Sequence, residues 1–408
     1  MSLVTTAAQP SVPAHVPPER VRDVDLYNLP GAQEDVHLAW KRIQDEAPDL
    51  YFTPRNGGYW VLNRAALMNQ VWPDHERFSS AKAIGIPNIP QMPAQIPIEV
   101  DPPQHRYFRH PINVAVSPRA IQSFTVEARA LAIELIEGFK ARGECEFVAE
   151  FAQFLPITIF LRLVDLPVSD RPWLLERAEL MVRSADMVAR MQAYQEIVGY
   201  LDGWVRKRRD QPGTDLISQI LQIRVGDRPI THEEAVSESA LVLFGGLDTV
   251  ASTMGFFARF LATHPAHRQQ LIDDPALIPQ AIEELLRRHS IPSLGRQLTE
   301  DMVLDGVQLK AGDRVMITVC MHGLDERAWP DPLTVDFKRN VQDHLAFGKG
   351  VHKCPGANLA RAELRVFLEE WLKRIPDFRI KPGEAAVSAT GPVAGMMHLP
   401  LVWPVQSA

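Results

Sequence analysis

The spacing of apolar residues along the chain predicts a mainly helical protein. From about Pro118 to Arg209 apolar positions recur at helical intervals, and Pro156, Pro167 and Pro212 are expected to break this stretch into separate helices. No internal repeat, low-complexity segment or linker is present in the sequence. The pattern therefore gives no boundary between two domains.

The longest predicted helix follows a capping box. Thr231 is a good N-cap residue, and Glu234 stands three positions later, where its carboxylate can reach back to the cap. The helical pattern then runs to His264, and Pro265 ends it. Such a helix of roughly 33 residues would measure ~50 Å. That length is enough to cross the whole molecule.

The remaining predicted elements are shorter. A further helix starts near Pro279, and another carries apolar positions from Leu364 to Ile375 before Pro376 stops it. Short strands, two of them near an Asp-Gly turn, are expected at 59–62, 302–307 and 315–318.

Composition narrows the possible functions. The chain has 408 residues and a net charge of −7 without a basic block, which disfavours nucleic acid as a partner. Three cysteines give no disulfide framework, so we expect a cytoplasmic protein. Residues 1–18 are expected to form a flexible tail. The apolar stretch 240–258 carries Asp248 at its middle, and a charge there costs roughly 2.5–3.5 kcal/mol in a membrane, so no membrane span is expected.

Cys354 stands in a setting unlike that of the other two cysteines. It lies in the run Phe347-Gly348-Lys349-Gly350-Val351-His352-Lys353-Cys354-Pro355-Gly356. A lone cysteine among glycines is a poor disulfide or zinc candidate but a good single thiolate ligand for haem iron. Its position just before a helix favours an anion. The alternative is a buried structural thiol, which is the interpretation we favour for Cys145 and Cys320.

The same run resembles the haem-ligand loop of the cytochromes P450. Phe347, Gly350, His352, Cys354 and Gly356 stand at the positions of that pattern, with His352 in place of the commoner arginine. The resemblance implies a mainly α fold with small β-sheets, formed by one large domain over residues 19–408. It also implies haem b with Cys354 as the axial ligand, and Phe347, Gly348 and Gly356 around the cofactor.

A second segment of the resemblance lies in the long helix. Gly245 and Gly246 adjoin there, at a cost of roughly 1 kcal/mol each against alanine. In the family the matching stretch opens locally over the haem, beside O₂. The resemblance thus gives Thr249 and Asp248 catalytic roles in a relay of protons to O₂. The alternative is close helix packing through small residues, with Asp248 in a salt bridge.

The resemblance also implies roles for several charged residues. Arg109, Arg296 and His352 match positions that hold the haem propionates, and each could instead be an ordinary surface base. Glu284 and Arg287 form a Glu-x-x-Arg pair, which the resemblance implies is closed by Arg339 into a structural network. The resemblance thus predicts both where these two groups of residues lie in the fold and what each group does.

The resemblance is strongest to the camphor-hydroxylating bacterial branch, over about residues 57–402. That branch takes electrons from NADH through a flavin reductase and a [2Fe–2S] ferredoxin. No flavin or nicotinamide fingerprint occurs in this chain, so electrons are expected from such a ferredoxin. Arg106, Arg109, Lys349 and Arg361 could dock it, or could simply be solvated.

Substrate contacts depart from that branch. No tyrosine occurs between Pro87 and Pro97, where the camphor branch has a hydrogen-bond donor. The expected pocket is apolar and suits a terpenoid-like molecule, such as a monoterpenoid or norisoprenoid. Its candidate residues are Ile84, Leu241, Phe244, Gly245, Thr249, Ile291, Pro292 and Val393.

Three functions remain open at this stage. The first is a ferredoxin-dependent, monomeric monooxygenase that inserts one atom of O₂ into an apolar small molecule. The second is a peroxygenase driven by H₂O₂, and the third is a non-catalytic haem sensor or carrier. Neither of the last two needs the Asp248–Thr249 pair, which favours the first.

Overall fold

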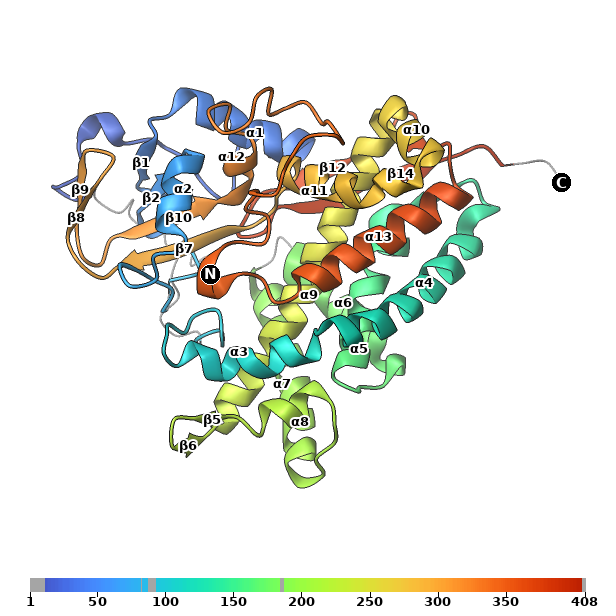
Figure 1. Cartoon of the computed structure of the whole chain (residues 1–408), viewed down its shortest axis with the longest axis horizontal. Coiled ribbons are helices and arrows are strands. Elements are labelled where there is room, and N and C mark those ends of the chain that lie inside the picture. The colour runs from blue at the N-terminus through green and yellow to red at the C-terminus, as the bar shows by residue number, and fades with distance from the viewer. Residues whose placement is uncertain (1–11, 82, 87–92, 184–186, 406–408) are drawn as a thin grey trace, which may run out of the picture.

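We describe the protein from a computed structural model, over residues 12–81, 83–86, 93–183 and 187–405. Helices dominate, as predicted, and the largest sheet lies on the left of Figure 1. The helices are α1 Ala32–Glu46, α2 Ala65–Val71, α3 His105–Ala115, α4 Pro118–Lys140, α5 Phe154–Leu163, α6 Arg171–Arg183, α7 Met187–Asp210, α8 Leu216–Ile220, α9 His232–Thr263, α10 Pro265–Asp273, α11 Ile278–Arg288, α12 Val319–Gly323 and α13 Ala357–Arg374.

The strands form one larger sheet and several small ones. The larger sheet has the order β1-β2-β10-β7-β3, and a second sheet has the order β11-β14-β4. The strands are β1 Leu50–Thr53, β2 Tyr59–Leu62, β3 Phe78–Ser79, β4 Glu144–Glu146, β5 Arg224–Val225, β6 Arg228–Pro229, β7 Ser293–Leu298, β8 Met302–Leu304, β9 Val307–Leu309, β10 Arg314–Thr318, β11 Arg379–Ile380, β12 Val387–Ala389, β13 Gly395–His398 and β14 Pro400–Val402.

Helix α9 joins the two hydrophobic clusters of the molecule. Its first half, from Ala235 to Leu247, packs into a cluster with α5, α7 and α8. Its second half, from Val250 to Ala262, packs into a larger cluster with the sheets, α11 and α13. Figure 1 shows α9 running through the middle of the molecule behind α13. The segment predicted to face the haem, 244–249, therefore lies where the two clusters meet.

The predicted start and end of α9 are confirmed. The Thr231 hydroxyl accepts from the Glu234 amide, and the Glu234 side chain returns to the Thr231 amide, as a capping box requires. The helix ends at Thr263, two residues before Pro265. By length and composition, α9 could cross a membrane. Most of its apolar window is buried inside the protein, however, so α9 is packed as a core helix.

One predicted helix break is wrong. Pro156 was expected to interrupt the helical stretch, but it lies within the first turn of α5. There its missing amide hydrogen would have no partner inside the helix, so proline costs little. Pro167 and Pro212 do lie between helices. The expected strand at 302–307 is a hairpin, β8 and β9, turning at Asp305 and Gly306.

The packed part of the chain begins before residue 19. Val16 is buried, and the His15 ring lies 2.8 Å from an Asp313 carboxylate oxygen. Within residues 12–18 of the predicted tail, His15 and Val16 are therefore packed against the rest of the protein. Burial of the apolar Val16 side chain favours this packing. Residues 1–11 lie outside the described part.

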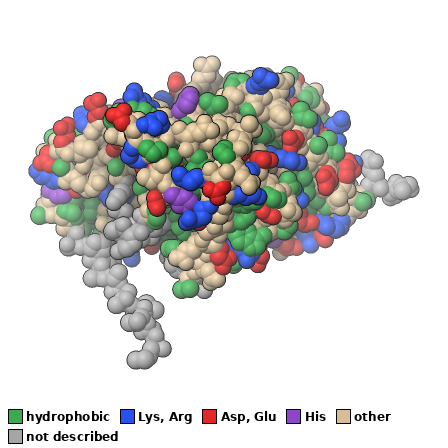
Figure 2. All heavy atoms as spheres, turned by 90° about the horizontal axis from the view of Figure 1, so that it is seen from below, with side chains coloured by type: hydrophobic (Ala, Val, Ile, Leu, Met, Phe, Trp, Pro, Cys, Tyr) green, Lys and Arg blue, Asp and Glu red, His purple; other side chains and the backbone are tan. Residues whose placement is uncertain are grey.

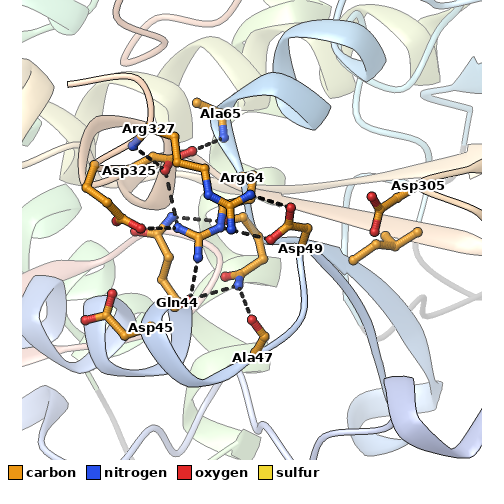
Figure 3. A network of polar contacts seen from close by, with 12 residues as sticks. Gln44, Asp45, Ala47, Asp49, Arg64, Ala65, Asp305, Asp325 and Arg327 are labelled. Atoms are coloured by element: carbon orange, nitrogen blue, oxygen red, sulfur yellow. Dashed lines mark hydrogen bonds and ion pairs between the residues drawn. The ribbon is translucent and has the colours of Figure 1, made fainter.

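A polar network fixes the loop after α12 to the sheet region (Figure 3). Arg64 lies between Asp49, at 3.2 Å, and Asp325, at 3.3 Å, and also reaches Glu326 at 2.9 Å. Asp325 in turn accepts from the Ala65 amide at 2.8 Å. Since Arg64 and Asp325 are both buried, this loop is held in one position relative to α2.

Candidate functional site

At two positions in the loop 347–356, the backbone adopts a conformation that favours glycine. Gly348 and Gly350 both have φ of +68°, in the left-handed region. A Cβ on Gly348 would come within 2.7 Å of the Trp72 ring, so the loop packs directly against the indole. The Cys354 amide closes the loop by donating to the Phe347 carbonyl at 2.8 Å. Cys354 is therefore held at a defined point just before α13.

Cys354 is exposed to solvent, unlike the buried Cys145 and Cys320. Desolvation nevertheless raises the pKa of its thiol, and the Gly356 amide, Arg109 and Arg361 oppose that rise. The pKa of Cys320, which burial raises to about 12, marks it as an inert thiol. Only Cys354 combines access with stabilising donors.

Basic groups without anions converge beside this loop. Arg296 is 2% exposed, and burial lowers its pKa to about 10. Burial and the charge of Arg296 lower the pKa of His352 to about 3, and neither ring nitrogen of His352 has a partner within the described structure. Arg109 donates to the carbonyl of Lys353, the residue before the cysteine. The structure thus brings together all three predicted propionate residues.

This cluster fits a bound dianion. Its members lower one another's pKa, and among the described residues only Asp101 opposes the charge on Arg296. A buried cation without a counter-ion costs several kcal/mol, and Arg296 is such a cation, whereas the lowered pKa leaves His352 neutral with ring nitrogens that have no partner in the described structure. A group that brings two carboxylates would satisfy them, so the residues around Cys354 fit haem b. The structure contains no ligand, and the assignment of these roles stays a prediction.

His105 belongs to the same cluster and was not singled out from the sequence. It is 4% exposed, its ring centroid lies 4.4 Å from that of His352, and its Nε2 has no partner in the described part of the chain. Burial lowers its pKa to about 4. A signal did exist, because His105 and Arg109 are four residues apart on one face of α3.

On α9, the segment around the glycines borders open space. Gly245 is exposed and Leu241 and Thr249 are half-buried, at i, i+4 spacing, whereas every residue from 250 to 258 is buried. A Cβ added at Gly245 or Gly246 would meet no atom within 4 Å. The alternative of close packing through small residues is therefore wrong for this segment. The glycines leave room instead.

The expected local opening of the helix is not present. Residues 232–263 form one continuous helix, and the Thr249 hydroxyl donates to the Gly245 carbonyl at 2.6 Å. This i−4 bond competes for the carbonyl without breaking the helix. Asp248 is half-buried one residue earlier, and a Cβ on Gly395 of β13 would lie 4.0 Å from its Oδ2. Thr249 and Asp248 thus stand side by side, as the sequence requires.

The remaining predicted pocket residues come from segments that meet at one end of β7. Pro292 forms a β-bridge with Val393, and the Ala394 amide donates to the Ile291 carbonyl at 2.8 Å. The Ile84 carbonyl accepts from the Gly295 amide at 3.2 Å. Ile291, Pro292 and Val393 are therefore neighbours through backbone contacts, whereas Ile84 lies beside Gly295 within β7. Leu241 and Phe244 lie on α9.

The segment that should cover the pocket is tied to α9. The Ser237 hydroxyl donates to the Ala94 carbonyl at 2.7 Å and accepts from the Ile96 amide at 3.1 Å. The stretch 87–92, in which the sequence lacks the expected tyrosine, falls outside the described residues. At Ala94 and Ile96 the backbone lies against the first half of α9.

The predicted structural network is present on α11. Arg287 makes two contacts of 2.8 Å with the Glu284 carboxylate, and both side chains are fully buried. Arg339 reaches the same carboxylate at 3.2 Å. Arg287 also donates to the carbonyls of Gly323 and Pro332. The network ties the segment before the Cys354 loop to α11.

The basic residues predicted to dock a ferredoxin differ in whether an acidic side chain already pairs with them. Arg361 is held by Glu283, with contacts of 2.6 and 2.8 Å, and its guanidinium lies 4.5 Å from the centre of the Phe347 ring. Lys349 is half-buried and donates to the Asn69 side chain at 2.9 Å, whereas Arg106 is exposed and lies over the Tyr107 ring. On the face drawn in Figure 2, basic and acidic side chains are interspersed.

Comparisons with known proteins agree with this geometry. The family model described as "Cytochrome P450" matches residues 169–387. "Probable cytochrome P450 127A1" from Sinorhizobium fredii is 35% identical and the match covers 96% of this chain and 97% of that protein. "Mycinamicin IV hydroxylase/epoxidase" from Micromonospora griseorubida is 32% identical, over 75% of this chain and 79% of the relative.

Solved structures are similar over nearly the whole chain. The crystal structure of the cytochrome P450 CYP101C1 has 39% identity and a TM-score of 0.88, and that of CYP101J2 has 38% identity and a TM-score of 0.86. Each match covers 97% of this chain and 100% of the other. The fold predicted from the sequence is confirmed.

Proposed function

The chain belongs to the cytochrome P450 family, and we propose that it is a monooxygenase that inserts one oxygen atom from O₂ into an apolar, terpenoid-like molecule. The observation that carries this proposal is the accessible Cys354 thiol beside Arg296, His352 and His105. Relatives named as hydroxylases and monooxygenases support the oxygen-inserting chemistry. The terpenoid class comes from the apolar side chains beside Gly245.

The chain would hold haem b from several sides. Cys354 would supply the thiolate, with the Gly356 amide directed to its sulfur. Arg296, Arg109, His352 and His105 would hold the propionates. Phe347, which packs on Arg361, would keep water from the sulfur. When bound, the haem supplies the iron chemistry, and a thiolate ligand favours cleavage of the O–O bond.

Thr249 and Asp248 would move protons in this site. The Thr249 hydroxyl can release the Gly245 carbonyl and turn toward the open space beside the glycines. The Asp248 side chain, in its protonated carboxyl form, would then pass a proton to Thr249 Oγ1 as that hydroxyl gives up its own proton toward the open space, and the carboxylate left behind would be reprotonated before the next transfer. Leu247 and Val250, both buried, limit the entry of bulk water along α9.

The electron source and surroundings follow from the resemblance. A [2Fe–2S] ferredoxin and its NADH-dependent reductase would supply electrons to a monomeric, cytoplasmic enzyme. Arg106, which is exposed, and Lys349, which is half-buried, are the bases on which that ferredoxin would dock. Arg361 is the weaker candidate because Glu283 already neutralises it.

The test is spectroscopic and then catalytic. The reduced, CO-treated protein should show the red-shifted Soret band of a thiolate-ligated haem, and Cys354→Ser should lose it. Cys145→Ser is the matched control, because that thiol is buried elsewhere, and it should keep the band. Absence of the band in the wild type would sink the proposal.

Turnover separates the two alternatives. A monooxygenase needs NADH, reductase, ferredoxin and O₂ for product. Product formed with H₂O₂ alone, at an equal or higher rate, would instead indicate a peroxygenase. Binding of ligand without product under either condition would indicate a sensor or carrier.

A further inference from the structure

A groove lies between α3 and the segment that follows α8. It has a volume of about 650 Å³ and is lined from both sides, by Arg106, His110 and Val114 of α3 and by Ile223 and Arg224 after α8, among others. Helix α3 contacts both α8 and β5, and Figure 1 shows these three elements together at the lower edge of the molecule. No sequence motif marks this groove.

The groove is distinct from the proposed haem site, although both use α3. Arg106, His110 and Val114 are four residues apart, so they follow one face of the helix, and all three are exposed. Arg109 lies on the neighbouring face, where it donates to the Lys353 carbonyl in the thiolate loop. The groove therefore belongs to the outer face of α3.

The charged groups of the groove carry one sign. Arg106, His110 and Arg224 line it, and no aspartate or glutamate does so among the described residues. Arg106 donates to the Tyr107 hydroxyl at 3.0 Å, and Arg224 donates to the Asp227 carbonyl, so neither is ion-paired within the described chain. A guanidinium has five N–H donors, and both therefore keep donors for an anion.

A smaller cavity beside Cys145 shows the opposite arrangement. It has a volume of about 220 Å³ and is lined by acidic as well as basic side chains. Lys381, one of these bases, lies 3.1 Å from Glu144 and 3.0 Å from Glu384. The charges of that cavity neutralise one another, whereas the arginines of the groove have no acid beside them.

The remaining surface of the groove is largely apolar. Val114 is 48% exposed, and Pro111, Ile223 and the half-buried Tyr107 line the same cavity. Covering Val114 with an alkyl chain would remove apolar surface from water. The volume of the groove is within the range of small-molecule sites. Its size and mixed lining favour a small amphiphile over a protein surface.

We propose that this groove binds an amphipathic carboxylate, a monoanion with an alkyl chain of medium length. The carboxylate accepts hydrogen bonds from the guanidinium groups, which suit that planar anion. The chain covers Val114 and Ile223. The site is independent of the proposed monooxygenase function, because it uses none of the residues assigned to the haem or to the substrate.

Calorimetric titration of the haem-loaded protein with decanoate tests the proposal. Decanoate should bind without changing the Soret band, because the groove lies outside the proposed substrate site. Acetate, which lacks the chain, and decyltrimethylammonium, which has the opposite charge, should each bind at least roughly tenfold more weakly. Decanoate binding that always accompanies a Soret shift would overturn the proposal. A glutamate hexapeptide that binds as tightly as decanoate would overturn it in favour of an acidic protein segment.

Arg224→Gln tests the charged part of the groove. It should raise the Kd of decanoate about fivefold, the upper end for an exposed charge pair. Arg228→Gln is the matched control, because it removes the same charge from the paired strand β6, where Glu234 already holds Arg228 at 2.6 and 2.8 Å. It should leave the Kd within twofold. Equal shifts in the two variants, or no shift in Arg224→Gln, would overturn the proposal.

Val114→Ser tests the apolar part. It should raise the Kd of decanoate about threefold, because the chain loses apolar contact, and leave that of acetate unchanged. Val126→Ser is the control, since Val126 is 68% exposed on α4 and does not line the groove. It should have no effect on either ligand. An unchanged Kd of decanoate in Val114→Ser would contradict the proposed position of the chain.

Discussion

Two buried glutamates, Glu284 on α11 and Glu238 on α9, are equally shielded from water but have opposite surroundings. Both are 0% exposed. The Glu284 carboxylate accepts from Arg287, Arg339 and the Asp336 amide. Neither carboxylate oxygen of Glu238 has a partner within the described structure. The same side chain is thus fully paired on one side of the molecule and left unpaired on the other.

This difference separates what the protein holds fixed from what it leaves open. Around α11 and the Cys354 loop, charges and backbone carbonyls lock each segment to its neighbours. Around α9, Glu238 has no partner in the described structure, and Gly245 borders open space. We infer that the first region fixes the position of the thiolate, whereas the second accommodates ligands. Four experiments test this distinction.

The largest effect should come from Glu284→Gln. It leaves Arg287 and Arg339 without their shared counter-charge, and breaking a buried pair costs about 3–5 kcal/mol. Denaturant unfolding followed by circular dichroism measures the loss. Arg365→Gln is the control, because it removes an exposed i, i+4 pair with Glu369 and should cost only about 0.3–0.5 kcal/mol. Equal losses would break the distinction.

Replacing Glu238 should have the opposite sign. Burial raises its pKa well above the ordinary value of 4.5, so the folded protein keeps this carboxyl protonated. The unfolded chain ionises above pH 4.5, and the wild type therefore loses stability as pH rises from there. Glu238→Met should stabilise the protein by about 1–3 kcal/mol, the penalty of an unsatisfied buried polar group, and the gain should grow from pH 4 to pH 8.

Glu234→Gln, one turn earlier on α9, provides the control for Glu238. Arg228 lowers the pKa of Glu234, so this carboxylate adds stability above pH 4.5 and loses it as the solution is acidified. Its replacement should destabilise the protein at pH 8 and have less effect at pH 4. Parallel pH profiles for the two variants would contradict the assignment of Glu238 as a buried neutral acid.

Thr249→Ala tests whether the open side also handles protons. Product formed per NADH should fall roughly tenfold, which is less than the ~10²–10⁴-fold contribution of a positioned acid or base, while NADH consumption continues and peroxide rises. Thr253→Ala is the matched control. The Thr253 hydroxyl lies one turn further along α9 and makes the same kind of i−4 hydrogen bond, to the Thr249 carbonyl. Thr253→Ala should form as much product per NADH as the wild type does. Unchanged coupling in Thr249→Ala would contradict the relay.

The smallest effect should come from Gly245→Ala. Because a Cβ there meets no atom within 4 Å, the variant should gain about 0.5–1 kcal/mol of stability from helix propensity. The added methyl group should weaken binding of the largest ligands. Gly203→Ala, on α7, also meets nothing and should give the same gain in thermal unfolding without any change in ligand binding. A destabilised Gly245→Ala would show that the position is packed.

Much of the fixed region could be predicted from the sequence because its signals are local. The loop around Cys354 and the Glu284–Arg287 pair are each contained within ten residues. The family resemblance supplied Arg339, Arg109 and Arg296, which lie far away in the sequence.

The open region was harder to predict because its features depend on distant segments. The stacking of Tyr194 on Phe244 joins helices 50 positions apart, and no local pattern marks it. The lack of a partner for Glu238 is invisible in a helical pattern that fits a surface acid equally well. The break predicted at Pro156 was wrong for a similar reason. Whether a proline interrupts a helix or lies in its first turn depends on where the helix begins.

The pairing of β14 has a consequence for biosynthesis. This strand lies between β11 and β4, so residues 400–402 complete a sheet whose other edge was translated more than 250 residues earlier. Until the ribosome has released them, Cys145 and its neighbours lack their hydrogen-bonding strand. The nascent polypeptide must therefore remain incompletely folded for most of its translation, and chaperones that shield apolar surface should associate with it during that interval.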